Sequence, residues 1–79
     1  MKMPMTLFET TDFYLACYLR CLEYELVDVR RDGGRSVFVF RDTPDRRAAI
    51  ISFYNNEGSV RPLTFVGIIK EMKGLLHNV

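Results

Sequence analysis

Residues 26–41 read LVDVRRDGGRSVFVFR and combine two strand-like runs with a turn signal. Leu26–Arg30 and Ser36–Arg41 are rich in Val and Phe, which favour extended structure. The connecting segment contains Gly33-Gly34, a pair that readily adopts the positive φ of tight hairpin turns. The stretch therefore predicts a β-hairpin.

The second strand of this hairpin carries apolar residues on both faces. Val37-Phe38-Val39-Phe40 lacks the polar alternation that is typical of a half-exposed strand. We expect the strand to lie either at the centre of a sheet or in a contact between two copies of the chain.

A short strand and a helix are expected before the hairpin. The alternation over Met5–Glu9 predicts the strand, and apolar residues at helical spacing predict a helix over Phe13–Leu22. Thr10-Thr11-Asp12 between them supplies side chains that cap helix N-termini. Arg20 alone interrupts the apolar circumference of the helix, so the helix has to be covered on more than one side. The cover is either the rest of the domain or a second molecule.

Two more helices are expected after the hairpin. Thr43 is expected to cap the first of them, with Pro44 in its first turn, an end near Asn56 and Gly58 in a left-handed turn beyond it. Arg61-Pro62 opens the second, whose apolar residues keep a 3.6-residue period to the end of the chain.

These elements predict one α+β domain over residues 1–79, in the order short N-terminal strand, helix, β-hairpin, helix, helix. A chain of 79 residues has room for one hydrophobic core. Because neither a signal peptide nor a membrane-spanning run is recognisable, we expect a cytoplasmic protein with no membrane association.

The opening TTDFYLA (residues 10–16) and the strand end FVFRD (residues 38–42) resemble a family of short bacterial proteins classed as a domain of unknown function. That family has a T-[ST]-D-F-Y-L-A opening and an F-x-F-x-D strand end. The resemblance covers nearly the whole chain. It implies the fold and a bacterial or mobile-element origin, but no activity, substrate or catalytic residue, because the shared residues are core and capping residues.

Candidate catalytic groups are few. His77 is the third residue from the C-terminus and has no assignable partner. Asp42 and Asp45 flank an expected helix start, where carboxylates commonly stabilise the helix. Cys17 and Cys21 are four apart in a predicted helix, which favours neither a disulfide nor a four-ligand metal site. We therefore expect no catalytic residue, no metal, no cofactor and no small-molecule substrate.

Binding to another macromolecule is the function that these observations favour. The apolar excess of the first helix and of the second hairpin strand points to a protein partner or a homodimer. The side chains expected in that contact are Tyr14, Tyr18, Phe38 and Phe40.

The alternative partner is a nucleic acid. Residues 30–47 contain six arginines and three aspartates, which gives a local net charge of +3 in a chain whose total is +1. Clustered arginines bind phosphates. The residues expected to do so are Arg30, Arg31, Arg35, Arg46 and Arg47.

Overall fold

The predicted hairpin forms two strands of a three-stranded antiparallel sheet. The computed structural model describes residues 6–78. In it β2 (Leu26–Asp32) and β3 (Arg35–Arg41) are joined by Gly33 and Gly34, whose φ angles are 59° and 88°. Both glycines thus lie in the left-handed region that a two-residue hairpin turn requires. The hairpin prediction is confirmed.

The short first strand, β1 (Leu7–Thr10), pairs antiparallel with β3, so that the strand order is β1-β3-β2. Met5, where the strand was expected to begin, lies outside the described residues. β3 is therefore the central strand, and Val37 to Phe40 are all buried. Its apolar character on both faces follows from this central position.

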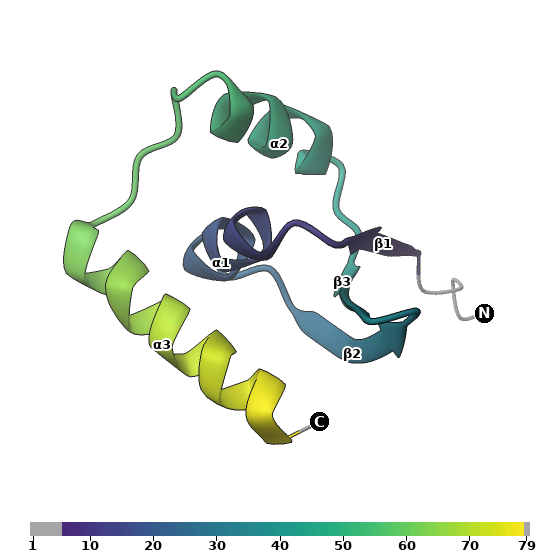
Figure 1. Cartoon of the computed structure of the whole chain (residues 1–79). Helices are drawn as coiled ribbons and strands as arrows, with labels where there is room; N and C mark the ends of the chain where they lie inside the picture. The colour runs from purple at the N-terminus through teal and green to yellow at the C-terminus, as the bar shows by residue number, and fades with distance from the viewer. Residues whose placement is uncertain (1–5, 79) are drawn as a thin grey trace.

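Three helices complete the fold and lie mainly on one side of the sheet (Figure 1). They are α1 (Phe13–Cys21), α2 (Arg46–Tyr54) and α3 (Pro62–Asn78). Figure 1 shows α1 at the centre of the molecule, with α2 above it, α3 at its lower left and the sheet to its right. The chain is α+β, as the sequence predicts.

The core forms around α1, because the other elements surround that helix. Leu15 to Leu19 of α1 are buried, and Phe38 and Phe40 of β3 and Met72 of α3 pack in the same cluster. The all-round apolar character of α1 is therefore accounted for by cover from within the chain, since the sheet, α2 and α3 all pack around it.

Three predicted details of α2 are wrong. Pro44, expected in the first turn, precedes the helix, which begins at Arg46. The residue that precedes the helix is Asp45, not Thr43, and the Thr43 hydroxyl instead contacts Asp45 and the Tyr24 hydroxyl. After the helix the left-handed residue is Asn56, at φ 58°, and not Gly58. Gly58 is needed for space, because a Cβ atom there would lie 2.7 Å from ring carbons of Tyr18.

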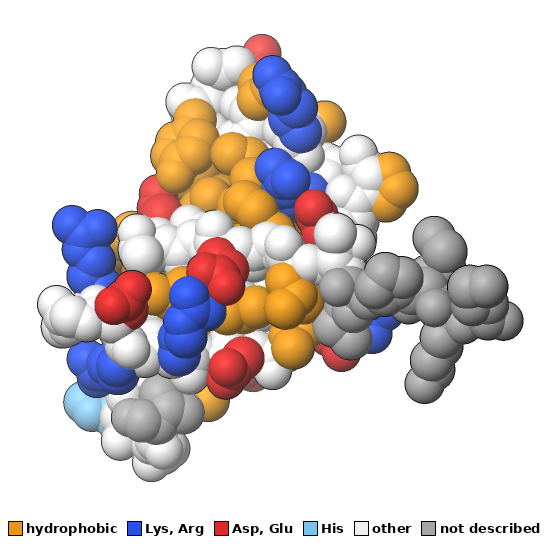
Figure 2. All heavy atoms as spheres, turned by 90° about the vertical axis from the view of Figure 1, so that its right-hand side faces the viewer, with side chains coloured by type: hydrophobic (Ala, Val, Ile, Leu, Met, Phe, Trp, Pro, Cys, Tyr) orange, Lys and Arg blue, Asp and Glu red, His pale blue; other side chains and the backbone are white. Residues whose placement is uncertain are grey.

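Charged side chains occupy the face of the sheet that points away from the core cluster. Two hydrogen bonds join Arg30 of β2 to Glu9 of β1, from Nη1 to Oε2 at 2.8 Å and from Nη2 to Oε1 at 2.7 Å. The pair spans β3, where Val37 and Val39 are nevertheless buried. Figure 2 looks toward this side of the molecule and shows acidic and basic side chains interspersed.

No helix within residues 6–78 has both the length and the apolar character needed to cross a membrane.

Candidate functional site

Three of the four side chains predicted to contact a protein partner are buried within the chain. Phe38 is 1% exposed, Phe40 0% and Tyr18 7%. The two phenylalanines are on the side of β3 that faces the core cluster, and the Tyr18 ring packs on Phe53 at a centroid distance of 5.2 Å. Their assignment to a partner surface is wrong, because these three side chains have their contacts inside the chain.

Tyr14 is the exception, since it is 53% exposed. Its ring lies edge-on to the Phe13 ring, with 5.2 Å between the centroids. Phe13 in turn lies 6.1 Å from Phe38. The rings of Phe38, Phe13 and Tyr14 therefore form a row that runs from the core to the surface.

A groove opens beside Phe13, between the start of α1, the start of β3 and the last turns of α3. Its volume is about 600 Å³, within the range of roughly 300–1,000 Å³ that is usual for ligand sites. We call it the Phe13 groove. Its lining residues are Thr11, Phe13, Arg35, Ser36, Phe38, Lys73 and Leu76.

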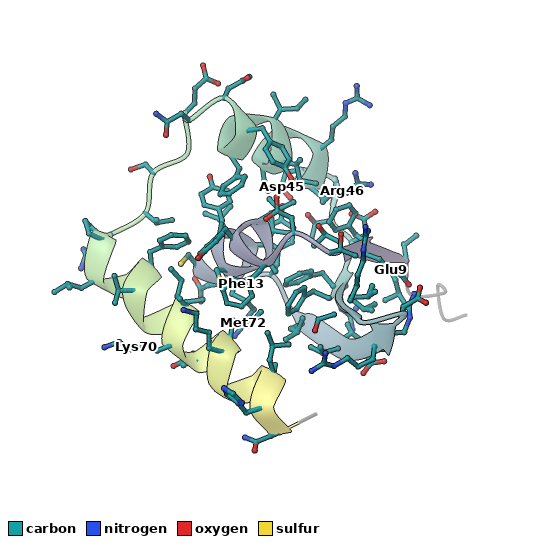
Figure 3. All side chains as sticks on the ribbon, viewed as in Figure 1. Glu9, Phe13, Asp45, Arg46, Lys70 and Met72 are labelled. Atoms are coloured by element: carbon teal, nitrogen blue, oxygen red, sulfur yellow. The ribbon has the colours of Figure 1, made fainter. Side chains whose placement is uncertain are left out.

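The local structure explains how Phe13 comes to line the groove. The Asp12 carboxylate accepts a hydrogen bond from the Leu15 backbone N–H at 3.1 Å and so caps α1. The Thr10 hydroxyl accepts one from the Asp12 N–H at 3.1 Å. These bonds start the helix at Phe13, which lines the groove together with Lys73 and Leu76 of α3 (Figure 3).

The groove combines an apolar floor with two cations. Phe13, Phe38 and Leu76 supply the floor, and Arg35 and Lys73 come from β3 and α3. Among the described residues, neither cation forms an ion pair. Asp32 stands opposite Arg35 in the β2–β3 register, yet no ion pair joins the two side chains.

Two of the five arginines predicted to bind nucleic acid are instead paired with carboxylates. Arg30 is paired with Glu9, and its hydrogen bonds hold the pKa of that carboxyl below the usual range. Arg46 is paired with Asp42 at 3.0 Å and also lies 4.6 Å above the Phe8 ring. Both arginines therefore have structural contacts that a phosphate would have to displace.

The other three predicted arginines, Arg31, Arg35 and Arg47, are exposed and have no ion pair among the described residues. The hairpin holds Arg31 and Arg35, and α2 holds Arg47, at opposite ends of β3. A seven-residue strand spans roughly 20 Å at 3.3 Å per residue. The structure therefore does not bring the five predicted residues into one cluster.

The remaining chemically active side chains have structural environments. Cys17 is buried, and desolvation raises the pKa of its thiol to about 11. Asp45 accepts hydrogen bonds from Tyr24 and Thr43, which lower the pKa of the Asp45 carboxyl. His77 is exposed in the last turn of α3. No group of three potential metal-ligating side chains occurs within residues 6–78.

Sequence reasoning singled out Tyr14 and Arg35 but missed Lys73 and Leu76 as site residues. Their spacing of three does place them on neighbouring positions of a helix surface, which is a usable signal. It does not show that this end of α3 faces the start of β3, because that contact depends on how the helix packs.

The chain belongs to a family described only as a domain of unknown function, DUF5659, which residues 5–78 match. No curated protein and no solved structure matches the chain.

Proposed function

We propose that this chain is a non-catalytic binding protein that uses the Phe13 groove and the adjoining Tyr14 ring to hold a segment of another protein. The observation that carries the proposal is the continuity of apolar surface from the groove floor through Phe13 to the exposed Tyr14. Exposed aromatic side chains beside a concave apolar surface are typical of protein contacts.

A protein segment suits this surface better than a small molecule. Tyr14 lies beside the groove, and a ligand confined to the groove would leave its ring in water. An extended segment can cover both.

The opening motif and the lack of a membrane-spanning helix in the described part of the chain support a cytoplasmic accessory protein of bacterial or mobile-element origin, which also remains a proposal.

The two features that suggested self-association are both explained without a second copy. β3 is covered as a central strand, and α1 is surrounded by the sheet and the other helices. We therefore propose a partner of different sequence, and a homodimer becomes an outcome that the experiment can detect.

Nucleic acid is a weaker candidate on the same geometry. Single-strand binders stack successive bases on exposed aromatics along a basic groove. Here Arg30 and Arg46 are held by carboxylates, and Tyr54, although 61% exposed, donates its hydroxyl to Asp12. Within residues 6–78, the arginines without an ion pair do not form a row beside the exposed rings.

Selection of random 12-residue peptides displayed on phage against the folded chain tests the proposal. We expect enriched peptides whose binding perturbs the NMR signals of Phe13, Leu76 and Tyr14. Tyr14→Ser should weaken binding at least tenfold. The matched control is Leu63→Ser, which removes an 84% exposed apolar side chain from the other end of α3, about 20 Å from Leu76 at 1.5 Å per residue.

Three results would contradict the proposal. The first is no enrichment over the bare support. The second is equal weakening by the two serine variants. The third is a 20-nucleotide single strand that binds at low salt more tightly than every selected peptide. A dimer at micromolar concentration in sedimentation equilibrium would contradict the proposal of a different partner.

A further inference from the structure

Arg35 and Lys73 set the charge of the Phe13 groove. They reach it from different elements, β3 and α3, and both line the same cavity. Elsewhere in the described chain, Arg30, Arg41 and Arg46 each have a carboxylate at 2.7, 2.9 and 3.0 Å respectively. Arg31 and Arg47 also form no ion pair among the described residues, but neither lines this groove. The groove is therefore a place where two cations without ion pairs in the described part of the chain lie next to an apolar floor.

We propose that the Phe13 groove selects an acidic segment of its partner, with one apolar side chain between Phe13 and Leu76 and carboxylates on Arg35 and Lys73. This inference rests on the proposed function. A guanidinium group binds a carboxylate through two parallel hydrogen bonds, and a lysine ammonium adds a compact second charge. The hydroxyls of Thr11 and Ser36, which also line the groove, can serve the backbone of the segment.

The arrangement of charge explains why the ligand should be an acidic peptide and not a nucleic acid. A nucleic-acid backbone carries a regular series of phosphates, and its binding grows with the number of cations along its path. The groove offers only two, and the floor between them is made by Phe13, Phe38 and Leu76. An acidic segment with a central apolar side chain complements both properties.

Charge reversal on α3 provides a test with a close control. Lys73→Glu places a carboxylate in the groove, whereas Lys70→Glu makes the same change of charge on the same helix at a residue that does not line it. Figure 3 shows Lys70 on the side of α3 that points away from α1. Both lysines are exposed, so both variants should fold.

The probes are three defined phage libraries of 12-residue peptides, in which apolar positions alternate with acidic, basic or uncharged polar positions. We expect the acidic library to be enriched at least tenfold over the other two. Measured by fluorescence anisotropy, the best acidic peptide should lose at least tenfold in affinity with Lys73→Glu and less than threefold with Lys70→Glu. Arg35→Glu should act like Lys73→Glu, and Arg47→Glu, at an exposed residue of α2 that does not line the groove, like Lys70→Glu.

The possible failures separate the inference from the proposed function. If uncharged peptides are enriched, bind in a Tyr14-dependent manner and are indifferent to Lys73→Glu, the acidic selectivity is wrong and protein binding stands. If Lys73→Glu and Lys70→Glu weaken the binding of an acidic peptide equally, the attraction is to the overall charge of the protein and the groove does not select the peptide. If no library is enriched, both the inference and the proposed function are wrong.

Discussion

At the scale of single residues, Gly58 shows how a loop is fitted to the core. A Cβ atom at this position would come within 2.7 Å of two carbons of the Tyr18 ring, and Tyr18 is itself held against Phe53. A buried ring in such a place cannot swing away, as the end of a long flexible side chain could. The absence of a side chain at residue 58 is therefore a packing requirement, separate from the conformational freedom of glycine.

Gly58→Ala should lower the free energy of unfolding by about 1–3 kcal/mol, the usual cost of forcing an extra methyl group into a packed site. The control is Gly67→Ala on α3, where a Cβ atom meets nothing within 4 Å. That change should raise the free energy of unfolding by up to about 1 kcal/mol, because alanine favours the helix over glycine. Urea denaturation of the three proteins measures both effects, and a Gly58→Ala protein as stable as the wild type would refute the packing argument.

The two cysteines of α1 should differ in reactivity. Burial raises the pKa of both thiols, that of Cys17 to about 11, but Cys17 is 0% exposed whereas Cys21 is partly exposed. Since the thiolate is the reactive form, an aromatic disulfide reagent at pH 8 should modify one thiol quickly and the second only after unfolding. Cys21→Ser should remove the fast phase and Cys17→Ser should leave it unchanged. A fast phase that disappears with Cys17→Ser instead would show that α1 is more open than the structure indicates.

At the scale of elements, the connection from β3 to α2 is fixed by polar contacts. Asp42 forms hydrogen bonds with the Arg46 guanidinium at 3.0 and 3.2 Å, and Asp45 accepts one from the buried Tyr24 at 3.0 Å. The hydrogen bonds from Arg46 lower the pKa of the Asp42 carboxyl from its ordinary value of 3.8. These contacts hold the start of α2 against the rest of the chain.

The lowered pKa of Asp42 makes its contribution dependent on pH. Because the folded pKa lies below the unfolded value of 3.8, the stabilisation is present above about pH 4 and is lost as the pH falls through the folded pKa. Asp42→Asn should therefore be less stable than wild type at pH 6, and this difference should shrink toward pH 2. Denaturation at both values measures it. Glu57→Gln, at an exposed residue with no ion pair in the described chain, should differ little from wild type at either pH.

Elements with strong local patterns could be predicted from the sequence, and those whose limits depend on tertiary contacts could not. Gly33-Gly34 predicts the hairpin because the turn needs positive φ whatever surrounds it. The start of α2 was misplaced because the Thr43 hydroxyl bonds to Tyr24 and Asp45 and does not cap the helix. The role of Gly58 was misread because its cause is the distant Tyr18 ring.

The site was predicted only in part for a related reason. The residue types of Tyr14 and Arg35 indicated that both could belong to a binding surface. Arg35 lines the Phe13 groove, and the Tyr14 ring lies next to Phe13. The same reasoning wrongly assigned Phe38 and Phe40 to a surface, since apolarity alone does not say whether the cover is internal or external. Arg35 and Lys73 line the same groove because β3 and α3 pack near each other, and no local sequence pattern predicts that packing.

At the scale of the whole molecule, no helix within residues 6–78 covers the face of the sheet that holds the buried side chains of Val37 and Val39. The Arg30–Glu9 pair spans the strand that carries them. Both partners of the pair are nearly half exposed, so its contribution to stability is small. Its larger effect is to place charged groups over Val37 and Val39, which would otherwise form an apolar surface through which copies of the chain could associate.

Replacement of this pair should therefore affect association more than folding. The double variant Glu9→Ala, Arg30→Ala should melt within a few degrees of wild type but self-associate at concentrations where wild type is monomeric, as measured by sedimentation equilibrium. Glu25→Ala, Arg41→Ala removes an exposed ion pair between the residue before β2 and the last residue of β3, and serves as the control. A double variant at residues 9 and 30 that remains monomeric at high micromolar concentration would show that Val37 and Val39 need no such cover.

Helix α2 has no fully buried residue, unlike α1 and α3. Apart from the polar contacts at its start, it is attached by partly buried side chains, by the Phe53–Tyr18 ring contact and by the Tyr54–Asp12 hydrogen bond at 2.6 Å. So few buried contacts imply a small free energy for local opening. Amide hydrogens of α2 should exchange with deuterium well before those of α1, and a protease should first cut between residues 55 and 61. The native state would then include a minor population in which α2 is detached while α1, α3 and the sheet remain folded.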